Sequence, residues 1–340
     1  MSTFQMPADA RERADLFRER YGAVRHQLAR VIVGQDDVLD TVLRTFFAGG
    51  NILLEGVPGL GKTMLVRTLS DAMHLEFARI QFTPDLMPAD VVGTTIVTED
   101  DAGKRVMVFR KGPIFANIVL ADEVNRATPK TQSALLEAMQ EHSVTVGGDT
   151  RLLPEPFLVI ATQNPIDMEG TYPLPEAQLD RFMVKVIVRY GSREELNEVI
   201  ARTTRRENAV AERVMDCEEV SAWRSFVRDV AVAPHVADYA TRLVIATHPG
   251  SEFATDLINK YVRFGSSPRG AQALILLGKV RALLEGRFNV SFRDVERDAL
   301  SVLRHRMIRN FEAEADGVES DAIVAEVVRA TEQADLLASA

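Results

Sequence analysis

Residues 56–63 read Gly-Val-Pro-Gly-Leu-Gly-Lys-Thr, the pattern G-x-x-x-x-G-K-[ST] of a phosphate-binding loop. Glycines in such a loop let backbone N–H groups approach phosphate oxygens that a Cβ would obstruct. We expect Lys62 to place its ammonium on the β- and γ-phosphates and Thr63 to give its hydroxyl to Mg²⁺. The helix that begins near Gly61 would direct its positive dipole end at the same anion.

The residues on either side of this loop favour a nucleotide site over an ordinary Gly-Pro turn. Asn51–Glu55 is a short apolar run of the kind found in a buried parallel strand. Met64–Met73 carries apolar residues four apart, which predicts a helix. Strand, loop and helix thus follow in the order that the motif requires.

Length, charge and cysteine content limit the number of domains, the expected partners and the possible disulfides. A chain of 340 residues is longer than a typical domain, so we expect two domains. The net charge of −9 makes nucleic acid an unexpected partner, because phosphate affinity comes chiefly from Lys and Arg, although a local basic surface remains compatible with it. Cys217 is the single cysteine, so an intramolecular disulfide is impossible.

Nothing in the sequence indicates export or a membrane span. Charged residues between Arg11 and Asp15 interrupt the N-terminal segment, unlike a signal peptide. No stretch approaches the ~20 apolar residues of a transmembrane helix. We therefore expect a cytoplasmic protein.

The pattern of apolar residues divides the chain into three parts. Residues 1–30 contain a lead-in helix, and residues 31–190 alternate strands with helices, which predicts a parallel sheet covered on both faces. Residues 191–340 read as successive amphipathic helices with few strand signals. The five strands are expected at residues 51–55, 77–80, 117–121, 157–161 and 183–188.

Two further segments predict β-hairpins. In the first, Thr94–Thr98 and Val106–Phe109 flank an Asp-Asp-Ala-Gly turn. In the second, Ser143–Val146 and Arg151–Leu153 flank Gly-Gly-Asp. Each is either a surface decoration or a moving element that contacts a substrate or a neighbour, and the pattern alone favours neither.

Polar residues follow the third and fourth strands. Ile118–Glu123 has the form of a Walker B segment, and ligands gather at the carboxyl ends of strands in open α/β sheets. Asp122 is thus placed to hold Mg²⁺, directly or through water, and Glu123 to polarise the attacking water. Acidic residues also favour helix starts, but the loop at 56–63 favours the catalytic interpretation. Asn164 could orient the water from the next strand, whereas alone it would read as a turn residue before proline.

Together, residues 56–63, 122–127 and 161–165 resemble the AAA+ ATPases, and residues 174–182, 267–269 and 302–306 look like the MoxR family. The resemblance spans nearly the whole chain. It implies an AAA+ α/β parallel-sheet nucleotide-binding core with helices on both faces and a C-terminal all-helical lid domain. It also identifies the hairpins as the helix-2 and pre-sensor-1 inserts, which favours a functional role for them.

The resemblance implies roles for individual residues. Asn164 matches sensor 1, Arg181 matches the arginine finger that would reach the γ-phosphate bound by the next subunit, and Arg269 matches sensor 2 of the lid. With Lys62 and Glu123 they form the predicted catalytic set, and Thr63 and Asp122 are the predicted metal ligands. The predicted nucleotide-binding residues, beside the adenine and along the loop, are Val33, Gly34, Gly56, Val57, Pro58, Gly59, Leu60, Gly61, Lys62, Thr63 and Met64.

Physical reasoning supports the implied roles of Arg181 and Arg269 only in part. A guanidinium at a subunit boundary would make hydrolysis depend on assembly, but Arg181 follows Asp180, and a local salt bridge is a fair alternative. Arg269 begins a helix, where its charge opposes the dipole, which hints at an external anion. We interpret His305, which lies between two arginines in an expected helix, as part of a solvated basic face.

The resemblance implies a chaperone-like remodelling ATPase that uses ATP and Mg²⁺ and self-associates into a ring, a hexamer in our prediction. Its implied partners are separate proteins with von Willebrand factor A domains, and its implied role is complex maturation or metal-cofactor insertion. The alternatives are a nucleic-acid-dependent motor, a metal-chelatase motor subunit and a non-hydrolysing nucleotide-gated scaffold. The acidic charge argues against the first, and Glu123 and Asn164 would have little role in the last.

Overall fold

Five parallel strands form the central sheet, in the order β2-β5-β8-β1-β9. The computed structural model describes residues 4–101, 103–165, 170–204 and 209–338. All five expected strands are present, and their parallel pairing is confirmed. Their bounds are β1 (Ile52–Glu55), β2 (Phe77–Gln81), β5 (Ile118–Asp122), β8 (Leu158–Gln163) and β9 (Val184–Ile187).

Side chains alternate between the two faces of this sheet, and each face is covered by helices. Ile52 and Leu54 of β1 belong to one apolar cluster with α1 (Ala10–Val31), α2 (Asp36–Ala48) and α3 (Lys62–Ala72). Leu53 belongs to the opposite cluster with α4 (Pro88–Val92) and α5 (Pro129–Glu141). Because β1, β5 and β8 bury both faces, they are apolar almost throughout, as a parallel sheet requires.

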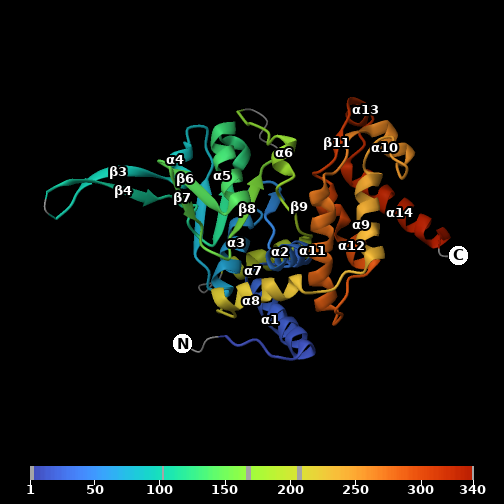
Figure 1. The fold of residues 1–340 in the computed structure, drawn as a ribbon, viewed down its shortest axis with the longest axis horizontal. Coiled ribbons are helices and arrows are strands. Elements are labelled where there is room, and N and C mark those ends of the chain that lie inside the picture. Colours follow the sequence, from blue (N-terminus) through green and yellow to red (C-terminus); the bar gives the residue numbers. More distant parts are fainter. Residues whose placement is uncertain (1–3, 102, 166–169, 205–208, 339–340) are drawn as a thin grey trace.

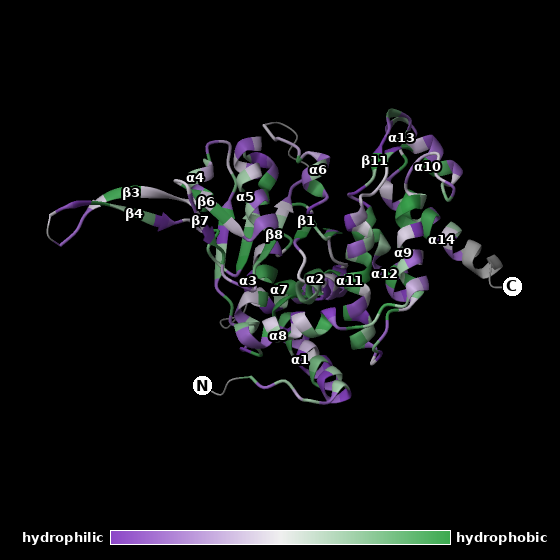
Figure 2. Ribbon diagram, viewed as in Figure 1, coloured by the Kyte–Doolittle hydropathy of each residue, from purple (hydrophilic) through white to green (hydrophobic). Residues whose placement is uncertain are grey.

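Both predicted hairpins are present. The first, β3 (Gly93–Glu99) with β4 (Arg105–Lys111), projects away from the body of the molecule (Figure 1). Its two strands include hydrophobic residues (Figure 2), and Ile96, Val97, Met107 and Val108 are exposed. The second joins β6 (Ser143–Val146) to β7 (Asp149–Leu152). Its turn is two glycines with φ of 65° and 90°, so the aspartate expected in the turn begins β7 instead.

The chain beyond the sheet is helical, as expected, and most of it lies to one side of the sheet (Figure 1). A short antiparallel ribbon of β10 (Val262–Phe264) and β11 (Ile308–Arg309) adds to this helical region. The predicted domain boundary near residue 190 stays a prediction. The helices are α7 (Arg193–Thr203), α8 (Cys217–Arg228), α9 (Pro234–Ala246), α10 (Asp256–Tyr261), α11 (Pro268–Leu284), α12 (Phe292–Leu303), α13 (Phe311–Ala315) and α14 (Ser320–Ala338). Within the described residues, no helix combines the length and apolar character needed to cross a membrane.

The interpretation of the segment around His305 as a solvated basic face is wrong. Helix α12 ends at Leu303, and His305 and Arg306 are each only 7% exposed. The Nε2 atom of His305 and the Nη2 atom of Arg306 both contact the backbone carbonyl oxygen of Phe182. The Nδ1 atom of His305 is buried without a hydrogen-bond partner among the described residues. Arg304 also turns inward and pairs with Asp321 of α14 at 2.9 Å.

A buried carboxylate connects the helical region to the core. Asp298 of α12 is 2% exposed and pairs with Arg44 of α2 at 3.0 Å and with Arg281 of α11 at 3.1 Å. Burying a charge is costly unless it is paired, so the three residues depend on one another. The cluster fixes α11 and α12 against α2.

We predict that Asp298→Ala lowers the free energy of unfolding by about 3 to 5 kcal/mol, because it leaves two buried guanidinium groups without a counter-charge. Chemical denaturation followed by circular dichroism measures this. Glu198→Ala is the control, since the Glu198–Arg202 pair is solvent-exposed and its loss costs less than about 1 kcal/mol. Equal effects of the two substitutions would contradict the assigned importance of the buried cluster.

Candidate nucleotide-binding site

The loop at residues 56–63 connects β1 to α3, as predicted. Gly59 and Gly61 have φ of 86° and 77°, a left-handed conformation that favours glycine. Gly56 is constrained differently, because a Cβ there would lie 2.6 Å from the carbonyl oxygen of Val188. The loop therefore needs glycine both for its turns and to pass the end of β9.

Lys62 lies within this loop and faces the acidic edge of the sheet. Its Nζ donates to the carbonyl oxygen of Gly56 at 2.5 Å. Burial lowers the pKa of Lys62, and the nearby carboxylates of Asp122, Glu123 and Glu55 act in the opposite direction. The ammonium thus shares one region with the two predicted acidic residues.

Asp122 ends β5 and is largely buried, with two strong partners. Its Oδ2 accepts hydrogen bonds from Arg79 of β2 at 2.6 and 3.0 Å. Its Oδ1 accepts from the Thr162 hydroxyl of β8 at 2.6 Å. Strands on both sides of β5 therefore fix the orientation of this carboxylate.

Glu123 adopts a left-handed backbone conformation, with φ of 56° and ψ of 49°, just before the 3₁₀ turn η1 (Val124–Arg126). Such a conformation costs roughly 1–2 kcal/mol for a residue with a Cβ and is typical of functional sites. The Glu123 amide donates to the Thr162 hydroxyl at 2.8 Å. Its Oε2 accepts from Gln81 at 3.0 Å and from Arg126 at 2.9 Å.

Asn164 directly follows β8, the strand between β5 and β1, and is 5% exposed. The sheet order therefore places it at the edge where Glu123 and the loop also lie. Its carbonyl oxygen accepts from Asn125 at 3.4 Å. The Asn125 Oδ1 is buried without a hydrogen-bond partner among the described residues. One buried acceptor beside Asn164 is therefore left unsatisfied.

The segment predicted to lie beside the adenine connects α1 to α2 and is tied to the loop. Gln35 donates from Nε2 to the carbonyl oxygen of Leu60 at 3.3 Å. Gly34, which follows Val33, has φ of 66°, and the Glu195 carboxylate of α7 packs where a Cβ would be. A hollow of about 850 Å³ opens beside this segment and is bordered by Tyr190. Met64, at the other end of the loop, is half-exposed.

Both predicted arginines contact residues outside the loop. Arg181 follows the short helix α6 (Glu176–Leu179) and donates to the Leu136 carbonyl oxygen of α5 at 2.7 Å. It lines a hollow of about 430 Å³ on that side. Asp180 does not pair with Arg181 in the described structure: its carboxylate is held by Ser267, Arg269 and Arg306. The anion beside Arg269 is thus an internal carboxylate, at 3.5 Å.

Four residues that hold the acidic pair were not predicted from the sequence, although each contact is short. Arg79 and Gln81 come from β2, Thr162 from β8 and Arg126 from η1. The alternation of polar residues in β2 is a weak signal for them. The pairing of β2 and β8 with β5 brings Arg79, Gln81 and Thr162 to the site, and no local pattern specifies that pairing. Arg126 instead reaches Glu123 from three residues further along the chain.

A glycine-rich loop between a parallel strand and a helix, with paired acidic residues at the end of a nearby strand, defines a P-loop nucleotide-binding protein. Residues 51–184 match the profile of the ATPase family associated with various cellular activities (AAA), and residues 255–327 match the AAA lid domain.

Relatives extend this match over most of the chain. Chaperone MoxR1 of Mycobacterium tuberculosis is 40% identical over 89% of this chain and 79% of its own length. The YeaC protein of Bacillus subtilis is 44% identical over 91% and 92%. A solved structure from Cytophaga hutchinsonii, described as a candidate ATPase, superposes with a TM-score of 0.87 at 41% identity, covering 94% of this chain and 96% of that one. The chain belongs to the MoxR family of chaperone-like AAA+ ATPases.

We predict that Gly56→Ala weakens nucleotide binding by about 1 to 3 kcal/mol, because the added methyl group must displace the loop or the end of β9. Titration with a fluorescent ATP analogue measures this. Gly22→Ala in α1 is the control, since a Cβ there meets nothing within 4 Å and the helix gains propensity. Unchanged binding in the Gly56 variant would contradict the close approach to Val188.

Proposed function

We propose that this chain hydrolyses ATP with Mg²⁺ at the loop of residues 56–63. One observation carries the proposal: β5, β8 and β1 lie side by side and end in Asp122, Asn164 and the loop, so the groups needed for hydrolysis share one sheet edge. The AAA family profile over this region supports nucleotide binding.

In this proposal the loop amides and Lys62 hold the phosphates, and Lys62 exchanges its bond to the Gly56 carbonyl for a phosphate oxygen. Thr63 and Asp122 would hold Mg²⁺. They fit this ion, which prefers oxygen ligands, takes only one or two from the protein and obtains others from phosphates and water. Bound Mg²⁺ would neutralise charge that develops on the phosphates.

Glu123 would act as the base that polarises the attacking water, and Asn164 would orient that water. The Glu123 carboxylate is engaged by Gln81 and Arg126. For Glu123 to contact the attacking water, its carboxylate would exchange at least one of these donors for that water. Arg269 would leave Asp180 to reach the nucleotide of its own subunit.

We further propose assembly into a hexameric ring in which Arg181 reaches the γ-phosphate bound by the next subunit. AAA+ proteins typically assemble into rings, which supports this arrangement. The client would be a separate protein with a von Willebrand factor A domain, and the remodelling would serve complex maturation or metal-cofactor insertion. The chaperone name of the mycobacterial relative supports remodelling in general. The cytoplasmic location stays a prediction.

Glu123→Gln should reduce kcat for ATP by about 10² to 10⁴-fold while ATP still binds, because the amide keeps the shape but cannot accept the proton. Phosphate release and nucleotide titration measure the two effects. Glu252→Gln, at an exposed loop position, is the control. Full turnover in the Glu123 variant would refute its role as the base.

The same variant tests the client. Held in ATP, Glu123→Gln should retain a protein with a von Willebrand factor A domain in a pull-down, because the ring cannot advance past its ATP-bound state. Lys62→Ala, which loses its contact with the phosphates, is the control and should retain less of that protein. If the two variants retained no such protein, or equal amounts, the proposed partner class would be wrong.

A further inference from the structure

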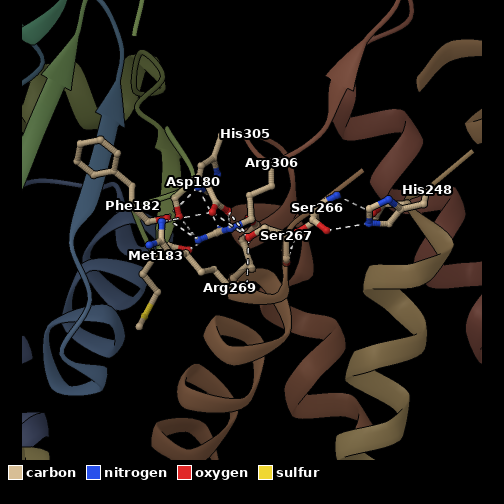
Figure 3. A network of polar contacts seen from close by, with 11 residues as sticks. Asp180, Phe182, Met183, His248, Ser266, Ser267, Arg269, His305 and Arg306 are labelled. Carbon is tan, nitrogen blue, oxygen red and sulfur yellow. Dashed lines mark hydrogen bonds and ion pairs between the residues drawn. The ribbon is translucent and has the colours of Figure 1, made fainter. Parts of the chain in front are cut away.

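Arg306 holds the backbone on both sides of Arg181 (Figure 3). Its Nη2 donates to the carbonyl oxygens of Asp180 at 3.2 Å and Phe182 at 2.6 Å, and its Nη1 donates to that of Met183 at 3.0 Å. Its Nε donates to the Asp180 carboxylate at 3.1 Å. The side chain is 2% exposed, so these contacts replace its water completely.

His305 adds to this grip from the same segment. Its Nε2 lies 3.0 Å from the Phe182 carbonyl oxygen (Figure 3). Burial and the neighbouring guanidinium lower the pKa of His305 well below its ordinary value, so the ring is neutral near pH 7. Ser267, at the start of α11, donates to both oxygens of the Asp180 carboxylate at 2.8 Å. Two separate segments of the helical region thus fix residues 180–183.

Arg181 itself takes no part in these contacts and extends the other way. Its guanidinium reaches α5, where it donates to the Leu136 carbonyl oxygen and borders the hollow of about 430 Å³. The carbonyl before it and the carbonyl after it are both held by Arg306. Together with His305, Arg306 thus forms a clamp on residues 180–183, and a shift of this clamp moves the backbone from which Arg181 projects.

We propose that Arg306 and His305 are positioning residues for Arg181, so that the helical domain of one subunit sets hydrolysis in the site of its neighbour. The inference rests on the proposed action of Arg181 on the next subunit. If the contacts of Arg306 and His305 with residues 180–183 only joined the helical region to the core, their loss would instead lower stability or alter the nucleotide site of the same subunit.

The first test is Arg306→Lys, which keeps the charge beside Asp180 but cannot span the carbonyls of residues 180, 182 and 183. We expect kcat for ATP to fall about 10- to 100-fold, because displacements near 1 Å have such effects, while KM stays within about twofold. Arg304→Lys is the matched control: Arg304 lies two residues away, its side chain is 11% exposed, and it pairs with Asp321 instead. Equal activity of the Arg306 variant and the wild type would overturn the proposal.

Rings mixed from two variants show whether Arg306 affects ATP hydrolysis in the neighbouring subunit or in its own subunit. Glu123→Gln subunits lack their own base but present an intact Arg181. Arg306→Lys subunits have an intact base but present Arg181 poorly. If Arg306 acts through Arg181, an equal mixture regains about one quarter of wild-type turnover, since half of the competent sites then face a Glu123→Gln neighbour in the ring. Each variant alone stays low.

A mixture of Arg181→Ala and Glu123→Gln subunits is the reference, because it tests directly whether Arg181 acts on the neighbouring subunit. If this mixture regains activity and the Arg306→Lys mixture does not, Arg306 acts on its own subunit and the clamp proposal is wrong, whereas the shared site stands. If the Arg181→Ala mixture also stays inactive, the action of Arg181 across the boundary is refuted, and the clamp proposal falls with it.

A second variant keeps the test decisive if Arg306→Lys folds poorly. His305→Ala removes the Nε2 contact with the Phe182 carbonyl oxygen and the packing of the buried ring beside Arg306, and it leaves the Arg306 side chain in place. We expect a smaller loss of kcat, restored by Glu123→Gln subunits in the same way. Sedimentation of each preparation confirms that rings form before turnover is compared. Loss of kcat without restoration in the mixture would overturn the proposal.

Discussion

The parallel pairing of β5, β8 and β1 is the constraint on which the rest of the structure depends. Each strand buries both faces, so polar side chains can collect only where the strands end. The register sets Glu55 beside Gln163 and Ala121 beside Ala161, and the three ends therefore finish at one edge. Thr162 shows the consequence: one hydroxyl accepts from the Glu123 amide and donates to the Asp122 carboxylate.

Local sequence patterns were sufficient to predict the strands, the loop and the acidic pair, because each is specified by neighbours along the chain. The loop needs glycines at adjacent positions, and the buried strands need continuous apolar runs. The partners of the acidic pair could not be predicted in this way. Arg79 reaches Asp122 only because β2 pairs with β5, and strand order is set by packing between distant segments. The role assigned to Asn164 rests on its place after a strand and on the resemblance, and the roles of Arg181 and Arg269 rest chiefly on the resemblance; all three stay predictions.

Composition misled the interpretation of His305 and Arg306 for a related reason. Two arginines around a histidine resemble a solvated surface, since charged side chains are seldom buried without partners. Here the partners are backbone carbonyls near the end of α6, more than a hundred residues earlier. A guanidinium carries five donors in one plane, so it can satisfy several carbonyls at once and stay buried.

Asp180 pairs with both Arg306 and Arg269, and the two pairs differ in burial. The pair with Arg306 is costly to break, whereas the pair with Arg269 is not. Arg306 is almost completely buried, and breaking a buried pair leaves a charge without a partner at a cost of about 3 to 5 kcal/mol. Arg269 is 42% exposed and meets the same carboxylate at 3.5 Å, so that contact contributes about 0 to 1 kcal/mol. Arg269 can therefore turn toward a bound nucleotide at little cost while Arg306 keeps its hold on residues 180–183. Under the proposed role of Arg269, this hierarchy would let the helical region respond to its own nucleotide without releasing the backbone that carries Arg181.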